Sequence, residues 1–206
     1  MKNSIVWLVV ICLAGCVSVQ PKGLYEMAGD PEPLNVYGFS QLEIFKDDIT
    51  SEVWFTENQT CLNVKQERDQ KFDGSGAIRI KWDKQAGGCP WLGLGIGWSG
   101  WAGKDFSQIY DKAALSFRVK TDQKPMNGLP WAIGFEDYGG SQKWTGGTPD
   151  IVVNGPISDK WTQVKIPLTK FDMQYGDFDI YAIKQLLFQF ESNGEVFVDH
   201  IEIVSL

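Results

Sequence analysis

Two stretches of the sequence combine aromatic rings with hydrogen-bonding side chains. Residues 89–101 read CPWLGLGIGWSGW, and residues 131–144 contain two tryptophans, a tyrosine, two acidic residues and a glutamine. A planar ring can cover the apolar C–H face of a pyranose while amides and carboxylates bind its hydroxyls. These residue types predict a carbohydrate site whose candidates are Trp91, Trp98, Trp101, Trp131, Glu136, Asp137, Tyr138, Gln142 and Trp144.

Glycines alternate with large apolar residues in the first stretch. Leucine, isoleucine and tryptophan occupy the even positions from 92 to 98, and glycine occupies the odd positions from 93 to 97. Because glycine weakens the interior of a strand, its repetition indicates that a neighbouring ring or a ligand comes close to that face. Ordinary packing is the alternative for each tryptophan, and it is the expectation for Trp82 and Trp161, which lie beside apolar strand positions.

The acidic residues of the second stretch do not form a catalytic pair. Glu136 and Asp137 are adjacent, so on a strand they face opposite ways. A glycosidase needs two carboxyl groups roughly 5 to 10 Å apart across a bond. His200, the single histidine, lies beside Asp199 and is expected on a solvated strand face. The sequence has no G-x-S-x-G, H-E-x-x-H, P-loop or dinucleotide motif, so we predict no catalytic residue.

Three runs in the last third of the chain predict strands, because they are rich in β-branched and aromatic residues. They read WTQVKIPL, IKQLLFQF and VFVDHIEIV. In the last run Phe197, Ile201 and Ile203 share the parity that is expected to face the core, and Asp199 shares it with them. A lone buried carboxylate requires a cation, several hydrogen-bond donors or a proton.

The same runs carry a resemblance to a known group of domains. The pattern W-x-x-V-x-I-P-L, followed by an apolar strand and a closing V-x-V-D-x-I, resembles the end of galactose-binding-like jelly-roll modules. That group includes non-catalytic carbohydrate-binding modules and the sandwich domains appended to bacterial glucanases. The resemblance implies a structural role for Trp161. It also implies a structural calcium held by Asp199 with Asp48 and Asp73, although plain turn chemistry is the alternative for the latter two.

The rest of the chain also reads as β structure. About ten or eleven short strands with polar connections, no helical period over three turns and no internal repeat indicate a sandwich. We therefore predict an all-β fold, an antiparallel β-sandwich of the jelly-roll type. Besides the closing runs, the predicted strands cover residues 42–45, 53–55, 61–65, 77–82, 92–98, 114–120, 131–136 and 150–153.

The N-terminus predicts export and lipidation. A basic residue, Lys2, precedes a short apolar run that ends in Leu-Ala-Gly-Cys, which looks like a bacterial lipobox. We expect a signal peptide over residues 1–15, a tether lipidated at Cys16 over residues 16–36 and one sandwich domain over residues 37–206. Two or more acyl chains anchor a protein stably. An ordinary secretory peptide is the alternative.

Cysteine usage and net charge indicate which covalent bonds and which partners to expect. Cys12 leaves with the signal and Cys16 takes the lipid, so Cys61 and Cys89 are expected to form a disulfide. The net charge of −7 comes without a basic block, which argues against nucleic acid as a partner. Val17 follows the cysteine that is expected to be lipidated, and by resemblance to proteobacterial lipoproteins it favours the outer membrane. Whether the domain lies on the periplasmic or the cell-surface face of that membrane stays open.

These observations predict a lipoprotein that binds polysaccharide, glucan-like, through aromatic stacking and polar contacts and without catalysis. Such a protein touches the membrane only through its lipid, and it keeps polysaccharide near the cell or presents it to polysaccharide-degrading enzymes. Two alternatives stay open. One is a jelly-roll glycoside hydrolase or polysaccharide lyase. The other is a structural or assembly lipoprotein that binds a protein partner.

Overall fold

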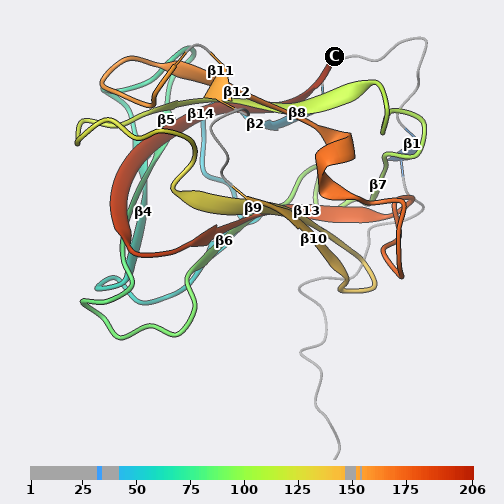
Figure 1. Cartoon of the computed structure of the whole chain (residues 1–206), viewed down its shortest axis with the longest axis horizontal. Coiled ribbons are helices and arrows are strands. Elements are labelled where there is room, and N and C mark those ends of the chain that lie inside the picture. The colour runs from blue at the N-terminus through green and yellow to red at the C-terminus, as the bar shows by residue number, and fades with distance from the viewer. Residues whose placement is uncertain (1–31, 34–41, 147–151, 154) are drawn as a thin grey trace, which may run out of the picture.

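The computed structural model describes residues 32–33, 42–146, 152–153 and 155–206. Two sheets lie one above the other, and their facing sides form the core (Figure 1). The predicted signal peptide, Cys16 and most of the predicted tether lie outside the described residues. No helix within those described ranges is both long and apolar enough to span a membrane.

Sheet A is the lower layer in Figure 1 and carries the glycine-rich stretch. Its long strand β13 lies between β6 and β9, while β3 flanks β6 and β10 flanks β9, all antiparallel. The short β7 pairs with the start of β13, and β1 pairs with β7 in parallel. The strand bounds are β1 Glu32–Pro33, β3 Val53–Phe55, β6 Gly93–Ile96, β7 Lys104–Asp105, β9 Trp131–Asp137, β10 Gln142–Thr145 and β13 Ile183–Phe190.

Sheet B is the upper layer and has the order β11, β12, β8, β14, β5, β4, with β2 beside the end of β14. A short 3₁₀ helix, η2, Leu168–Phe171, follows β12. All pairs in sheet B are antiparallel, so the predicted all-β sandwich is confirmed. The strand bounds are β2 Leu42–Phe45, β4 Leu62–Glu67, β5 Ala77–Asp83, β8 Ala113–Lys120, β11 Val152–Val153, β12 Thr162–Pro167 and β14 Asn193–Ser205.

Aromatic residues from both sheets meet in the core. The ring centroids of Trp82 and Phe190 are 5.0 Å apart, and those of Trp131 and Phe188 are 5.7 Å apart. The Trp82 Nε1–H donates to the carbonyl of Glu191 at 2.8 Å, which meets the hydrogen-bonding need of a buried indole. Trp82 is therefore a packing residue, as the sequence predicts.

The alternation predicted for the last strand is wrong at its centre. A β-bulge lies in β14 between Asp199 and Glu202, and His200 has a left-handed φ of 54°. The extra residue reverses the parity, so Val198 faces the core before the bulge and Ile201 faces it after the bulge. Phe197 and Asp199 consequently lie on the outer side of sheet B, where the Phe197 ring lies 5.2 Å from the Lys120 ammonium.

A second correction concerns the region after β9, where the sequence predicts no strand before residue 150. Residues 142–145 form strand β10, which pairs with β9 from Glu136 back to Ile133. The turn between the two strands is tight, with Gly140 at φ 84°, which only glycine adopts readily. The hairpin brings Trp144 to the outer edge of sheet A.

The predicted disulfide is present. Cys61 and Cys89 are bonded, with their Cα atoms 6.4 Å apart. Cys61 immediately precedes β4 in sheet B, whereas Cys89 lies two residues before Trp91. The bond thus fixes the segment that leads to the glycine-rich strand.

Candidate functional site

Four tryptophan rings lie directly over glycines on the outer face of sheet A, and we call them the ring row. A Cβ atom built on any of these glycines would come closer than 3.0 Å to the ring above it. The rings therefore rest on bare backbone, which a side chain would prevent. The pairs are Trp91 over Gly93, Trp54 over Gly95, Trp101 over Gly97 and Trp144 over Gly134.

The strand register places two of these rings symmetrically about the central strand. Trp54 pairs with Gly95, and Gly95 pairs with Leu187. On the other side Leu187 pairs with Gly134, which pairs with Trp144. Four strand spacings separate the two tryptophan backbones, which corresponds to about 19 Å. Each ring reaches inward from an edge strand, so the two rings lie over the glycines on either side of Leu187.

Three rings of the row also follow the direction of β6. Gly93, Gly95 and Gly97 are two residues apart, so the rings above them are spaced by about 7 Å along the strand. The planes of Trp54 and Trp91 are inclined by only 22°, with centroids 6.1 Å apart. Trp91 is 41% exposed, so its ring offers area to a ligand. Neighbouring aromatic rings are thus what the glycine alternation accommodates.

Glutamines hold the two edge rings in place. The Trp54 Nε1–H donates to Oε1 of the buried Gln185 at 2.6 Å. The Trp144 Nε1–H donates to Gln142 Oε1 at 3.2 Å, and Gln142 Nε2–H donates to Glu136 Oε2 at 2.7 Å. Because these indole donors are already satisfied, both rings present their faces, and not their N–H groups, to a ligand.

The acidic group on this face is neutralised by its neighbour. Lys184 Nζ lies 2.7 Å from Glu136 Oε1, and the two side chains are only 11% and 13% exposed. Charge-assisted hydrogen bonds of this kind are short and strong. The polar strip between the rings therefore carries a balanced ion pair and amides, which suits a neutral, hydroxyl-rich ligand.

Trp101 is held in place by an unusual backbone. Ser99, Gly100 and Trp101 all have left-handed φ values, of 50°, 68° and 64°. A bulky residue at such a φ is an outlier that surrounding contacts must maintain. Two contacts do so, because Tyr138 Oη–H donates to the Trp101 carbonyl and Gly100 N–H donates to Glu52 Oε1. Tyr138 thus helps to hold the backbone of Trp101, and with it one ring of the ring row, in position.

Three of the predicted site residues belong to the core and leave the candidate set. Trp98 and Trp131 are 2% and 3% exposed, so neither ring can cover a sugar. Asp137 is fully buried, and its carboxylate accepts hydrogen bonds from the backbone N–H groups of Ser141 and Asp179 at 2.9 and 2.6 Å. The even-numbered parity already places Trp98 beside core residues.

The structure brings the other predicted residues to one face and adds several. Trp91, Trp101, Glu136, Tyr138, Gln142 and Trp144 all belong to the ring row or its hydrogen-bonded support. Sequence reasoning missed Trp54 and Gln185. Trp54 lies in a strand of three residues, too short for alternation to show which way it points. Gln185 stands out in the run IKQLLFQF only as a polar residue within a buried strand.

Asp199, predicted as a calcium ligand, is buried at the bulge of β14. Its carboxylate accepts hydrogen bonds from the backbone N–H groups of Phe72 and His200, each at 2.7 Å. Burial raises the pKa of Asp199, while these donors act in the opposite direction. Hydrogen-bond donors, one of the three ways to support a buried carboxylate, are thus in place at Asp199.

The other two predicted ligands lie in turns near this place. Asp48 pairs with Arg68 at 2.5 Å, and Asp73 accepts a hydrogen bond from the N–H of Gly74 at 2.8 Å. Both contacts are turn or surface chemistry. The part of the chain that the structure describes contains no cluster of three or more acidic, histidine or cysteine side chains suited to a metal.

Calcium at Asp199 stays a prediction with a direct check. If Asp199, Asp48 and Asp73 hold the ion together with backbone carbonyls, metal removal leaves three carboxylates without their cation. Treatment with EDTA is then expected to lower the melting temperature, and added calcium is expected to restore it. Differential scanning fluorimetry measures both. An unchanged melting temperature in a metal-free sample would contradict the site.

Comparisons with solved structures agree with the two-sheet fold. The family 30 carbohydrate-binding module of cellulosomal cellulase Cel9D-Cel44B of Clostridium thermocellum is 23% identical, with a TM-score of 0.66 over 81% of this chain and 98% of that one. A family 11 module from the same organism, in complex with a β-1,3-1,4-mixed-linked tetrasaccharide, is 13% identical, with a TM-score of 0.52 over 80% and 95%. At these identities the likeness shows the jelly-roll fold.

The family assignment comes from the sequence itself. No curated protein matches the chain. The family model described as carbohydrate binding domain 30 matches residues 41–205, which spans both sheets and the whole ring row. The chain therefore belongs to the carbohydrate binding domain 30 family.

Proposed function

We propose that the chain binds a neutral, glucan-like polysaccharide on the ring row, without catalysis. The observation that carries the proposal is the set of four tryptophan rings resting on glycines across one face of sheet A. A fold that needed these rings only for packing would bury them between the sheets, as it does with Trp98 and Trp131. Rings on the outer face contribute contact area to a ligand.

The mechanism is stacking combined with hydrogen bonds to hydroxyls. The apolar faces of successive pyranoses lie on the rings, so the burial of C–H groups supplies most of the binding free energy. Beside Trp144, the exposed Gln142 offers its amide to sugar hydroxyls, while the largely buried Glu136 holds that amide in place. Because the Glu136 charge is balanced by Lys184, an uncharged sugar chain meets no net repulsion there.

The choice of a glucan rests on related folds. The similar family 30 module comes from a cellulase, and the similar family 11 module holds a β-1,3-1,4-mixed-linked tetrasaccharide. A chain of β-linked glucose has all its hydroxyls equatorial and thus presents flat apolar faces. A surface of flat-lying rings suits that shape.

The lipid anchor completes the proposal. Acylation of Cys16 at the predicted lipobox would fix the domain to the outer membrane through two or three acyl chains. The protein would then hold polysaccharide near the cell for degrading enzymes. Metabolic labelling with palmitate tests this step, because a Cys16→Ala variant is expected to lose the label.

Affinity electrophoresis on a panel of soluble polysaccharides tests the binding itself. The wild-type protein is expected to be retarded by β-glucans and to migrate like an unrelated acidic protein in gels without glycan. The same polysaccharides are assayed for released reducing ends and unsaturated products. Unretarded migration of the wild-type protein in gels containing each of the glycans would contradict the proposal. Product release would favour a hydrolase or a lyase instead.

A further inference from the structure

A pocket of about 430 Å³ lies at the end of sheet A, outside the ring row. Segments that follow β7 and η2 and that precede β13 form its walls. Buried apolar side chains form part of the lining, namely those of Met173, Phe178 and Ile180. Tyr181 also lines the pocket and is 61% exposed. Because the first three side chains are almost fully buried, Tyr181 is the apolar side chain of the lining that solvent reaches most.

Backbone hydrogen bonds hold these walls in place. The Phe106 N–H donates to the Ile180 carbonyl at 3.0 Å, which joins the first wall to the third. The Asp179 N–H donates to the buried carboxylate of Asp137 at 2.6 Å, and the Tyr181 N–H donates to Asp179 Oδ1 at 3.0 Å. The pocket is therefore formed before any ligand arrives, as small-molecule sites usually are.

The polar groups around the pocket can both donate and accept hydrogen bonds. Gln108 and Gln174 contribute exposed amides, and Asp179 contributes a carboxylate. Ser107 Oγ is buried without a hydrogen-bond partner among the described residues. Asp179 is the only charged residue among those that line the pocket in the described ranges. This combination suits a neutral ligand with several hydroxyls and one apolar face, and it disfavours an anion.

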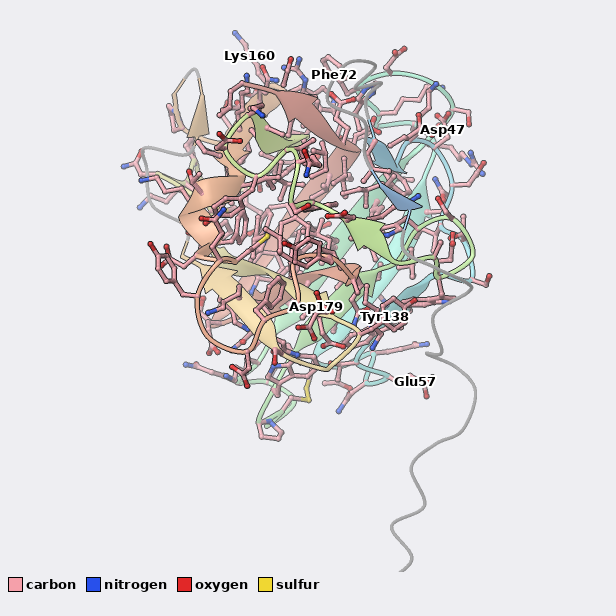
Figure 2. All side chains as sticks on the ribbon, turned by 90° about the vertical axis from the view of Figure 1, so that its right-hand side faces the viewer. Asp47, Glu57, Phe72, Tyr138, Lys160 and Asp179 are labelled. Atoms are coloured by element: carbon pink, nitrogen blue, oxygen red, sulfur yellow. A yellow bond between two sulfur atoms is a disulfide. The ribbon has the colours of Figure 1, made fainter. Side chains whose placement is uncertain are left out.

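The pocket lies at the Trp101 end of the ring row. Ile183, at the start of β13, pairs with Lys104, so residues just before β13 lie beyond that end of the row. The Tyr138 N–H donates to the Ala182 carbonyl at 3.1 Å, and its hydroxyl donates to the Trp101 carbonyl. Figure 2 shows Asp179 and Tyr138 close together in the lower half of the molecule.

We propose that this pocket is a second saccharide site, which binds a neutral mono- or disaccharide. The Tyr181 ring contacts the C–H face of the sugar, while Gln108, Gln174 and Asp179 bind its hydroxyls. The site uses none of the four rings of the row. The proposal of a second site can therefore be tested independently of the proposed polysaccharide binding.

Chemical-shift mapping with ¹⁵N-labelled protein locates the site directly. Cellobiose and glucose are titrated into the Trp54→Ala variant, in which the ring row is weakened. We expect backbone amide signals of residues 107–108 and 173–181 to shift with both sugars. Tyr181→Ala is expected to weaken that binding by about tenfold, because one stacking ring is lost. No shift in these residues with either sugar would overturn the proposal.

A charge variant tests the ligand class. Glucuronate has the same ring as glucose and adds a carboxylate, so it is expected to bind the pocket several-fold more weakly beside Asp179. Asp179→Asn keeps an oxygen for the Tyr181 N–H and removes the charge, so it should bring the two affinities together. An unchanged ratio would contradict the assignment. If the proposed polysaccharide binding on the ring row is wrong, the result is different. The wild-type protein would not be retarded by polysaccharides, while the amide signals of the pocket residues would still shift.

Discussion

Replacing Trp54 and Trp144 together by alanine is expected to lower the affinity for a soluble β-glucan by about a hundredfold. In the proposed binding mode each ring covers a sugar face from one edge of sheet A, and an aromatic contact of this kind contributes on the order of 1.5 kcal/mol. Two such losses add to about 3 kcal/mol, because the rings sit on opposite sides of Leu187 and share no hydrogen-bond partner. Isothermal titration calorimetry with the wild type and both single variants measures the effect.

A matched control separates ligand contact from general destabilisation. Phe72 is 42% exposed, comparable to Trp91, but it lies at the other sheet, where its N–H donates to Asp199. Phe72→Ala is therefore expected to bind glucan like the wild type. Melting temperatures of all variants show whether the fold is retained. A folded double variant with wild-type affinity would remove the ring row as the binding surface.

Removal of the disulfide is expected to have the largest effect on stability. Replacing Cys61 and Cys89 by serine frees a loop with a sequence separation of 28 residues. In the chain-entropy model this costs about 3.5 kcal/mol of unfolding free energy. Urea denaturation followed by tryptophan fluorescence measures the difference between the variant and the wild type.

The same cysteine replacement is also expected to alter the position of Trp91 in the ring row. Cys89 lies two residues before Trp91, so the variant loosens the segment that brings this ring over Gly93. Reduction of the wild type with dithiothreitol should reproduce the serine variant and serves as its control. A loss below about 1 kcal/mol would contradict the chain-entropy account.

Local patterns in the sequence predict the part of the fold that they encode directly. The alternation in WTQVKIPL places Val164 and Ile166 in the core, and both are fully buried. The even number of cysteines in the predicted sandwich domain predicts the bond between Cys61 and Cys89, which is present. The alternating glycines predict a close approach to that face, and tryptophan rings make it. Each of these inferences needs only the pattern of neighbouring residues or the number of cysteines.

Features that depend on pairing between distant strands were not predictable in this way. Trp54 reaches the site because β3 pairs with β6, a register that no local pattern shows. The bulge in β14 adds one residue and reverses the parity, which moves Asp199 from the expected core side to the outer side. Trp98 fits the sugar-binding residue types, but the packing of two sheets buries it. Composition alone does not separate a binding tryptophan from a core tryptophan.

The distribution of the rings over a sheet face has a consequence for polymers. Because the rings are spread across and along sheet A, a long chain bound as proposed could occupy the ring row in many overlapping positions without offering an end. The number of equivalent positions grows with chain length, so apparent affinity per polymer molecule rises even when each contact is unchanged. A chain that leaves one position finds the next one adjacent. In the proposed binding mode, retention on a long polysaccharide would thus come from frequent rebinding and would not require slow release.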